Sequence, residues 1–106
     1  MDEGVRKPAD DFEKVMQAAL EDDNIPTFYF NGFINSIGTG DVLIILRRHD
    51  KSIAKLHASY TVAKTLAEKL GALIARLEAD TGNTIMTTDV VNEALSRAKD
   101  GDDGTA

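Results

Sequence analysis

Residues 37–50 read IGTGDVLIILRRHD, and this stretch decides the fold of the chain. A glycine pair, an apolar run over residues 42–46 and a basic cluster follow one another in it. Glycine tolerates the positive φ values that tight hairpin loops need, so residues 38–40 predict a turn. The apolar run predicts a strand, and the short connections on both sides predict antiparallel pairing with neighbouring strands.

Two further strands and a long helix surround this stretch. Residues 27–37, TFYFNGFINSI, are rich in aromatic and β-branched side chains and predict a first strand. Asn31 and Gly32 within it fit either a hairpin turn or a bulge. Residues 51–59, KSIAKLHAS, predict a third strand beyond a polar turn at His49 and Asp50. A helix over residues 60–79 follows, with Ser59 as its N-cap and Gly82 as its C-terminal stop.

Shorter amphipathic helices are expected at both ends. Asp10 and Glu13 resemble a capping box before a helix over residues 11–21, and Thr87 or Thr88 can cap a last helix. The predicted organisation is a flexible N-terminus (1–9), one α+β domain (10–98) and a flexible acidic tail (99–106). The fold class is α+β, with a three-stranded antiparallel sheet packed on one long helix and short amphipathic helices at both ends.

The run over residues 42–46 does not alternate between apolar and polar side chains, so both faces of its strand need cover. Exposing the side chains of Leu43 and Ile45 would forgo about 1.5 to 3 kcal/mol each. The long helix covers one face of a three-stranded sheet. We therefore expect the second face to meet the terminal helices or another copy of the chain.

The long helix carries small residues at every fourth position beside its leucines, and these are Ala63, Ala67, Gly71 and Ala75. Small side chains let a second backbone approach closely. A terminal helix of the same chain is one candidate for that approach. Homodimerisation through this helix or through the sheet is the other, and we favour it because the terminal helices are short and weakly apolar.

A basic cluster follows the apolar run: Arg47, Arg48, His49, Lys51 and Lys55. With Tyr29 or Phe33 as stacking surfaces, Arg47, Arg48, Lys51 and Lys55 predict contacts to anions or single-stranded nucleic acid. Charged strand ends also serve simply to keep a sheet edge soluble. The net charge of −6 disfavours nucleic acid overall, although residues 27–87 alone carry +2 between segments of −5 and −3.

No motif predicts catalysis, a metal or a cofactor. The glycine turn leads into a strand and an acid, whereas phosphate loops lead into a helix. His49 and Asp50 are adjacent strand-end residues that point to opposite faces. There are no cysteines, no histidine pair at metal-binding spacing and no acid-rich calcium loop. We expect a non-enzymatic protein without catalytic, metal or cofactor residues.

The chain has the composition of a cytoplasmic, acidic protein. Its lack of cysteine fits a reducing compartment, and no apolar run reaches the length of a membrane span. The first twenty residues carry acids and no apolar segment typical of a secretory signal. We therefore expect a cytoplasmic location and no membrane partner.

Residues 53–82, preceded by TFYFNGF and DVLIIL, resemble a family of small bacterial domains of unknown function, a strand meander followed by a long helix, over about half the chain. The matching positions are Tyr29 or Phe30 with Asn31, Asp41, Ser59, Ala63 with Lys64, Leu66, Leu70 and Glu78. Tyr60 stands where the family usually has proline. The resemblance implies an α+β meander-plus-helix and implies no activity.

Together these features predict a small protein-interaction or assembly domain that associates with itself or docks onto a larger protein. The alternative is a single-stranded nucleic-acid-binding domain using the basic hairpin from Arg47 to Lys55. A third interpretation treats the terminal segments as docking arms for a larger protein.

Overall fold

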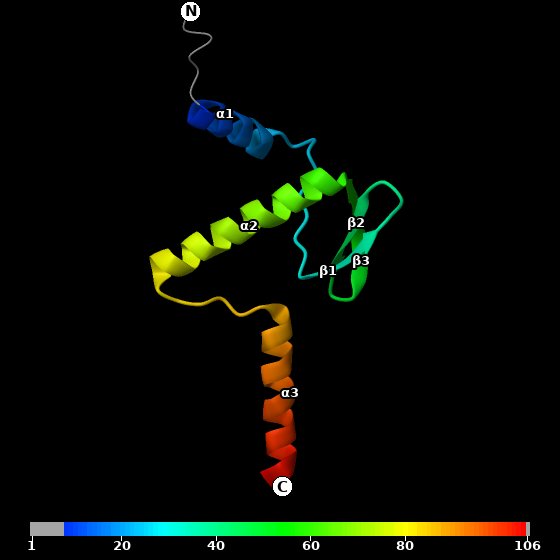
Figure 1. The fold of residues 1–106 in the computed structure, drawn as a ribbon, viewed down its shortest axis with the longest axis vertical. Helices are drawn as coiled ribbons and strands as arrows, with labels where there is room; N and C mark the ends of the chain where they lie inside the picture. Colours follow the sequence, from blue (N-terminus) through cyan, green and yellow to red (C-terminus); the bar gives the residue numbers. More distant parts are fainter. Residues whose placement is uncertain (1–7, 106) are drawn as a thin grey trace, which may run out of the picture. The chain divides into compact units, whose positions relative to one another are not determined.

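The computed structural model describes residues 8–105, and side-chain burial is described for residues 11–99. Its elements are α1 (Pro8–Glu21), β1 (Gly32–Ile37), β2 (Val42–Arg48), β3 (Lys51–Ala58), α2 (Tyr60–Thr81) and α3 (Thr88–Thr105), shown in Figure 1. The strands form one antiparallel sheet in the order β1-β2-β3. The predicted α+β class, the antiparallel sheet and the long helix are confirmed.

β1 starts five residues later than the sequence predicts. The backbone N–H of Asn31 donates to the carbonyl of Arg47 at 3.0 Å, and β2 ends one residue later. Only Arg48 is left in β2 opposite Phe30, so residues 27–29 lie beyond the end of β2, although their side chains have high strand propensity. Asn31 lies at a bend that opens β1, and its Oδ1 accepts a hydrogen bond from the His49 N–H at 3.2 Å. The hairpin-turn interpretation of Asn31 and Gly32 is wrong, because β1 continues to Ile37.

The predicted turn between β2 and β3 consists of two residues in the left-handed conformation. The φ angles are 51° at His49 and 68° at Asp50. This is the backbone that two-residue hairpins of the right-handed twist require, and histidine and aspartate adopt it more readily than most side chains do. The guanidinium of Arg47 donates to the Asp50 carbonyl at 2.6 Å and to the Ser52 hydroxyl at 3.4 Å, which ties the turn to both strands.

Asp50→Gly is expected to raise the free energy of unfolding by about 1 kcal/mol, because glycine removes the cost of a left-handed residue. The Arg47 bond is retained, since its acceptor is the backbone carbonyl of residue 50. Urea unfolding followed by circular dichroism measures the change. Asp23→Gly is the matched control at a turn residue without positive φ, where a loss is expected. Equal losses from both variants would contradict the prediction.

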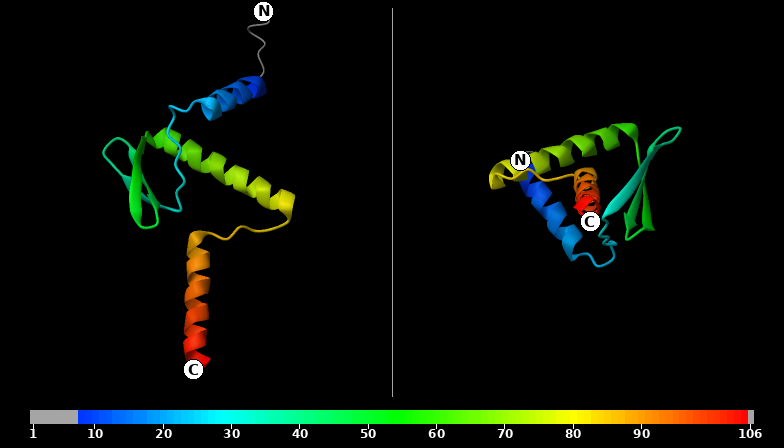
Figure 2. Two further views of the ribbon diagram at one scale, coloured as in Figure 1. Left: turned by 180° about the vertical axis from the view of Figure 1, so that it is seen from behind. Right: turned by 90° about the horizontal axis from the view of Figure 1, so that it is seen from below.

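α2 begins and ends where local sequence signals place it. The Ser59 hydroxyl accepts from the Val62 N–H at 3.1 Å, and Gly82 ends the helix with φ 69° and its N–H bonded to the Glu78 carbonyl. α2 is a continuous helix in both views of Figure 2, and its range includes Gly71. It extends two residues beyond the predicted end at residue 79.

α1 and α3 are both longer than predicted. α1 starts at Pro8, so the expected flexible segment 1–9 overlaps the helix at residues 8 and 9, while residues 1–7 lie outside the described part of the chain. Thr87, rather than Thr88, caps α3, because its hydroxyl accepts from the Val90 N–H at 3.2 Å. α3 then continues to Thr105, so residues 99–105 are helical where a tail was predicted, and residue 106 lies outside the described residues.

Contacts between residues divide the chain into two compact units. One holds residues up to Ile34 together with Ile44–Lys55, and the other holds Asn35–Leu43 together with residues from Leu56 onward. In the first unit, Leu46 at 6% exposure is the buried hydrophobic residue among residues 11–99. Within residues 8–105, none of the helices has the combined length and apolarity needed to cross a bilayer.

Candidate functional site

A line of exposed apolar side chains lies on α2. Positions four apart lie on one face of a helix, and Val62, Leu66, Leu70 and Ile74 form such a line, here called the apolar row. Their exposed fractions are 58%, 44%, 51% and 46%. Leu73 and Leu77, which complete the predicted leucine stripe, are also exposed. Burying one such side chain is worth about 1.5 to 3 kcal/mol, so an exposed row is a surface suited to protein association.

The small residues predicted as an association surface lie beside the apolar row. Ala67, Gly71 and Ala75 are exposed and Ala63 is half-buried. A Cβ atom built on Gly71 meets nothing within 4 Å, so no described contact within the chain requires glycine there. Glycine in a helix interior costs about 0.8 to 1 kcal/mol relative to alanine. No described contact of the chain offsets this loss of helix stability at Gly71. Close packing of another backbone against Gly71 would offset it.

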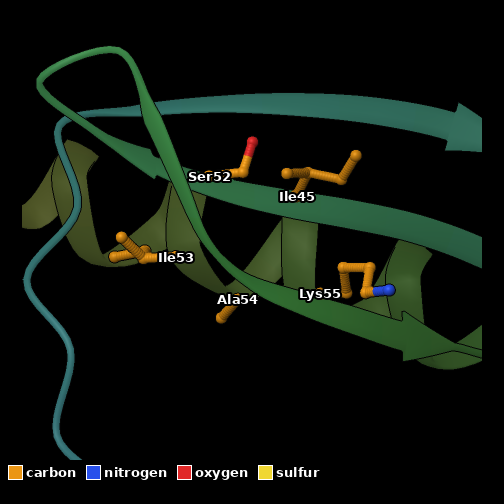
Figure 3. Close-up of a pocket in the computed structure, with 5 residues that line it drawn as sticks. All are labelled: Ile45, Ser52, Ile53, Ala54 and Lys55. Carbon is orange, nitrogen blue, oxygen red and sulfur yellow. The ribbon is translucent and has the colours of Figure 1, made fainter.

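The other predicted association residues, Leu43 and Ile45, lie on β2. Both are half-buried, as are their neighbours Val42 and Ile44. Ile45 also lines a surface hollow of about 430 Å³ together with Ser52, Ile53, Ala54 and Lys55 of β3 (Figure 3). The central strand therefore retains apolar surface, but less than α2 does.

The structure separates the predicted basic cluster. With a two-residue turn between β2 and β3, Arg48 lies opposite Lys51 on one face of the hairpin, and Arg47 lies opposite Ser52 on the other. Lys55 shares the face of Lys51 by strand alternation. Arg48, Lys51 and Lys55 are exposed, whereas Arg47 is half-buried and bonded to its own turn. Three cations, not four, therefore share one face.

The aromatic residues predicted as stacking surfaces are exposed, but they do not share one strand. Phe33 lies in β1 at 57% exposure, and Tyr29 lies before the strand at 69%. Both residues belong to the predicted first strand over residues 27–37, and Tyr29 lies outside β1.

A polar cluster at the β1–β2 turn was missed from the sequence. Asp41 Oδ2 lies 3.0 Å from His57 Nδ1, and the Tyr60 hydroxyl donates to the Gly38 carbonyl at 2.5 Å. The Gly38 N–H donates to the Asp41 carbonyl at 2.8 Å. His49 and Asp50 were weighed as an acid–base pair because they are adjacent, whereas Asp41 and His57 are sixteen residues apart. Because β2 and β3 are antiparallel neighbours, the start of β2 and the end of β3 lie at the same end of the sheet. This register is what brings Asp41 close to His57.

The Asp41–His57 pair connects the β1–β2 turn to the end of β3 and has a structural role. Both side chains are open to solvent, with exposed fractions of 43% and 60%. The nearby Ser59 hydroxyl is used as the N-cap of α2. Within the described residues, no three histidine or acidic side chains gather closely enough to hold a metal ion. The cluster joins the turn, the end of β3 and the start of α2 through two side-chain bonds.

The glycine turn forms as predicted, although the reason proposed for Gly38 and Gly40 is wrong. Gly82 is the glycine with positive φ among the described residues, so neither turn glycine uses that freedom. Gly38 is needed for close approach instead. A Cβ there would lie 2.9 Å from Asp41 Oδ1 and 3.4 Å from the Asp41 carbonyl oxygen, whereas a Cβ at Gly40 meets nothing within 4 Å.

Gly38→Ala is therefore expected to lower the free energy of unfolding by about 1 to 2 kcal/mol, because the Asp41 carboxylate must turn away from His57. Gly40→Ala is the matched control and is expected to leave stability unchanged or to raise it by up to about 1 kcal/mol. Urea unfolding of both variants measures the difference. Equal effects from the two substitutions would contradict the role assigned to Gly38.

The fold and surface define an α+β protein with an exposed apolar face on a long helix. Comparisons with protein-family models, curated proteins and solved structures found no match to this chain.

Proposed function

We propose that this protein is a non-enzymatic interaction domain that associates with itself. The exposed apolar row of α2 carries the proposal, because four large aliphatic side chains on one helix face are each at least 44% exposed. Small exposed positions beside that row favour a helix as the covering element. The half-buried apolar run of β2 adds a second, weaker surface.

Several features agree with this proposal. The Asp41–His57 pair joins the β1–β2 turn to the end of β3. The family of small bacterial domains that residues 53–82 resemble has no established activity. We further propose that the protein is cytoplasmic. The chain has no cysteine, so it needs no disulfide that a reducing compartment would break. The partner is a second copy of the chain, and docking onto a larger protein is the competing arrangement.

Size-exclusion chromatography with light scattering tests self-association across a concentration series. A mass of twice 11.5 kDa, falling toward the single-chain mass on dilution, is the expected result. A strict monomer at the highest concentration, with a folded circular dichroism spectrum, would reject the proposal.

A second candidate, binding of single-stranded nucleic acid, is favoured by the exposure of Arg48, Lys51 and Lys55 on one face of the hairpin. Fluorescence anisotropy with a labelled single-stranded oligonucleotide at low salt tests it. Binding that weakens with added salt and is lost in Arg48→Glu supports this candidate. No binding at low salt rejects it, and Arg76→Glu is the control for the same change of charge outside the hairpin.

A further inference from the structure

Asn31 is the asparagine of this chain that precedes a glycine, Gly32. The other four asparagines precede larger residues, which are Ile25, Ser36, Thr84 and Glu93. The backbone nitrogen of the residue after an asparagine can attack the side-chain Cγ and close a five-membered succinimide ring. A side chain on that next residue hinders ring closure, and glycine has none. Asn31 is therefore the asparagine whose neighbour obstructs this reaction least.

The fold leaves the attacking nitrogen of Gly32 at an open edge of the sheet. The Asn31 N–H donates to the Arg47 carbonyl at 3.0 Å, so the N–H of Asn31 faces β2. N–H groups alternate in direction along an antiparallel strand, so the Gly32 N–H points away from β2. β1 is an edge strand, and no further strand of the described residues pairs with that side of it. The Gly32 nitrogen is therefore accessible to the water or hydroxide that must take its proton.

The fold also provides a hydrogen-bond donor to the side-chain carbonyl that is attacked. The Asn31 Oδ1 accepts from the His49 N–H at 3.2 Å. Negative charge develops on this oxygen as the Gly32 nitrogen adds to Cγ, and a positioned backbone N–H stabilises that charge. Ring closure requires rotation at Asn31, which is exposed and lies at a bend just before β1. The end of a strand opens more readily than its interior, so this position permits the rotation.

We propose that Asn31–Gly32 is a site of spontaneous covalent modification in the folded protein, through a succinimide to aspartate and isoaspartate. The Gly32 nitrogen loses its proton and bonds to Asn31 Cγ, while the Cγ–Nδ2 bond breaks and Nδ2 leaves as ammonia with that proton. Water then opens the ring. Cleavage between the ring nitrogen and Cγ gives aspartate, whereas cleavage between the ring nitrogen and the main-chain carbonyl carbon gives isoaspartate. This reaction does not depend on the proposed self-association.

The two products differ in their effect on the sheet. Aspartate at position 31 keeps a side-chain oxygen that can accept from the His49 N–H. Isoaspartate routes the main chain through Cβ and Cγ, which lengthens it by a carbon atom before Gly32. The bond from the N–H of residue 31 to the Arg47 carbonyl and the pairing of β1 with β2 then no longer share one register. We therefore expect isoaspartate to lower the free energy of unfolding more than aspartate does.

Peptide mapping by mass spectrometry tests the site in the full chain, incubated folded at mildly alkaline pH. Asn31 is expected to react at least about tenfold faster than Asn83, which is also exposed and outside helices and strands. Gly32→Ala is expected to slow the reaction at Asn31 at least about tenfold, because the added Cβ hinders ring closure. That Cβ meets the Arg47 Cβ at 3.8 Å, an ordinary contact that the fold tolerates. Gly40→Ala, whose Cβ meets nothing within 4 Å, is the matched control and is expected to leave the rate unchanged.

Aspartate and isoaspartate at position 31 of the native protein, both slowed by Gly32→Ala, support the proposal. Faster reaction at Asn83, or an unchanged rate in Gly32→Ala, overturns the site. Reaction in urea but not in the native protein overturns the role of the fold, and aspartate without isoaspartate overturns the ring intermediate. Asn31→Asp is the standard for the aspartate product in ion exchange and urea unfolding. An isoaspartate fraction that unfolds at the same urea concentration as Asn31→Asp overturns the expected effect on β1.

Discussion

Leu46→Ala is expected to lower the free energy of unfolding by about 3 kcal/mol, the largest stability effect expected of a single truncation among residues 11–99. Leu46 lies in the central strand and is 6% exposed. Removing a buried leucine side chain loses its transfer free energy and leaves a cavity, which together cost about 2 to 5 kcal/mol. Small domains are stable by about 5 to 15 kcal/mol, so this single truncation removes a large share of the total.

Leu56→Ala provides the matched control for this prediction. Leu56 lies in β3 and is 45% exposed, so its truncation removes less buried area and is expected to cost about 1 kcal/mol. Urea unfolding followed by circular dichroism compares the two variants at one protein concentration, because self-association would otherwise add to the apparent stability. A larger loss from Leu56→Ala than from Leu46→Ala would contradict the assignment of Leu46 as the centre of the core.

Under the proposed self-association through the small residues of α2, Gly71→Leu is expected to weaken association by at least about 100-fold, because a branched side chain among the small residues keeps a second backbone from approaching closely. The same substitution raises intrinsic helix propensity by about 0.8 kcal/mol, so the single helix becomes more stable as the dimer is lost. Few substitutions move these two quantities in opposite directions. Light scattering measures the first quantity, and circular dichroism of the dilute monomer measures the second.

Thr65→Leu is the control for added bulk on α2. Thr65 lies on the side of the helix away from the small residues, and its hydroxyl bonds back to the Thr61 carbonyl at 2.9 Å. We expect Thr65→Leu to leave the dimer intact. A dimer that tolerates Gly71→Leu as well as Thr65→Leu would place the contact elsewhere, and the apolar surface of β2 would then be the next candidate.

The two ends of α2 and the start of α3 were predicted from sequence because these limits depend on neighbouring residues. The Ser59 hydroxyl caps a backbone N–H three residues away, and Gly82 adopts the left-handed conformation that ends α2. Thr87 acts on α3 in the same way as Ser59 acts on α2. These interactions span at most four residues, so their signals lie within a short stretch of sequence.

The candidate site was predicted less completely, because its parts depend on pairing between distant residues. The small residues of α2 were identified from their spacing alone. The separation of Arg47 from Arg48 and Lys51 follows from the two-residue turn and was not anticipated. The Asp41–His57 pair was missed because the sequence offers no measure of distance between residues at the two ends of a meander.

The sequence by itself determined the order and type of the strands and helices and the two ends of α2, because hydrophobic period, caps and turn residues act over a few positions. Only the tertiary structure decided where β1 begins, because residues 27–29 have the propensity of a strand but lie beyond the end of β2. Only the structure showed why Gly38 is glycine, since its constraint is the nearby Asp41 carboxylate rather than its own φ angle. The register of β1 against β2 and the approach of Asp41 to Gly38 each depend on two segments, so neither can be read from one segment alone.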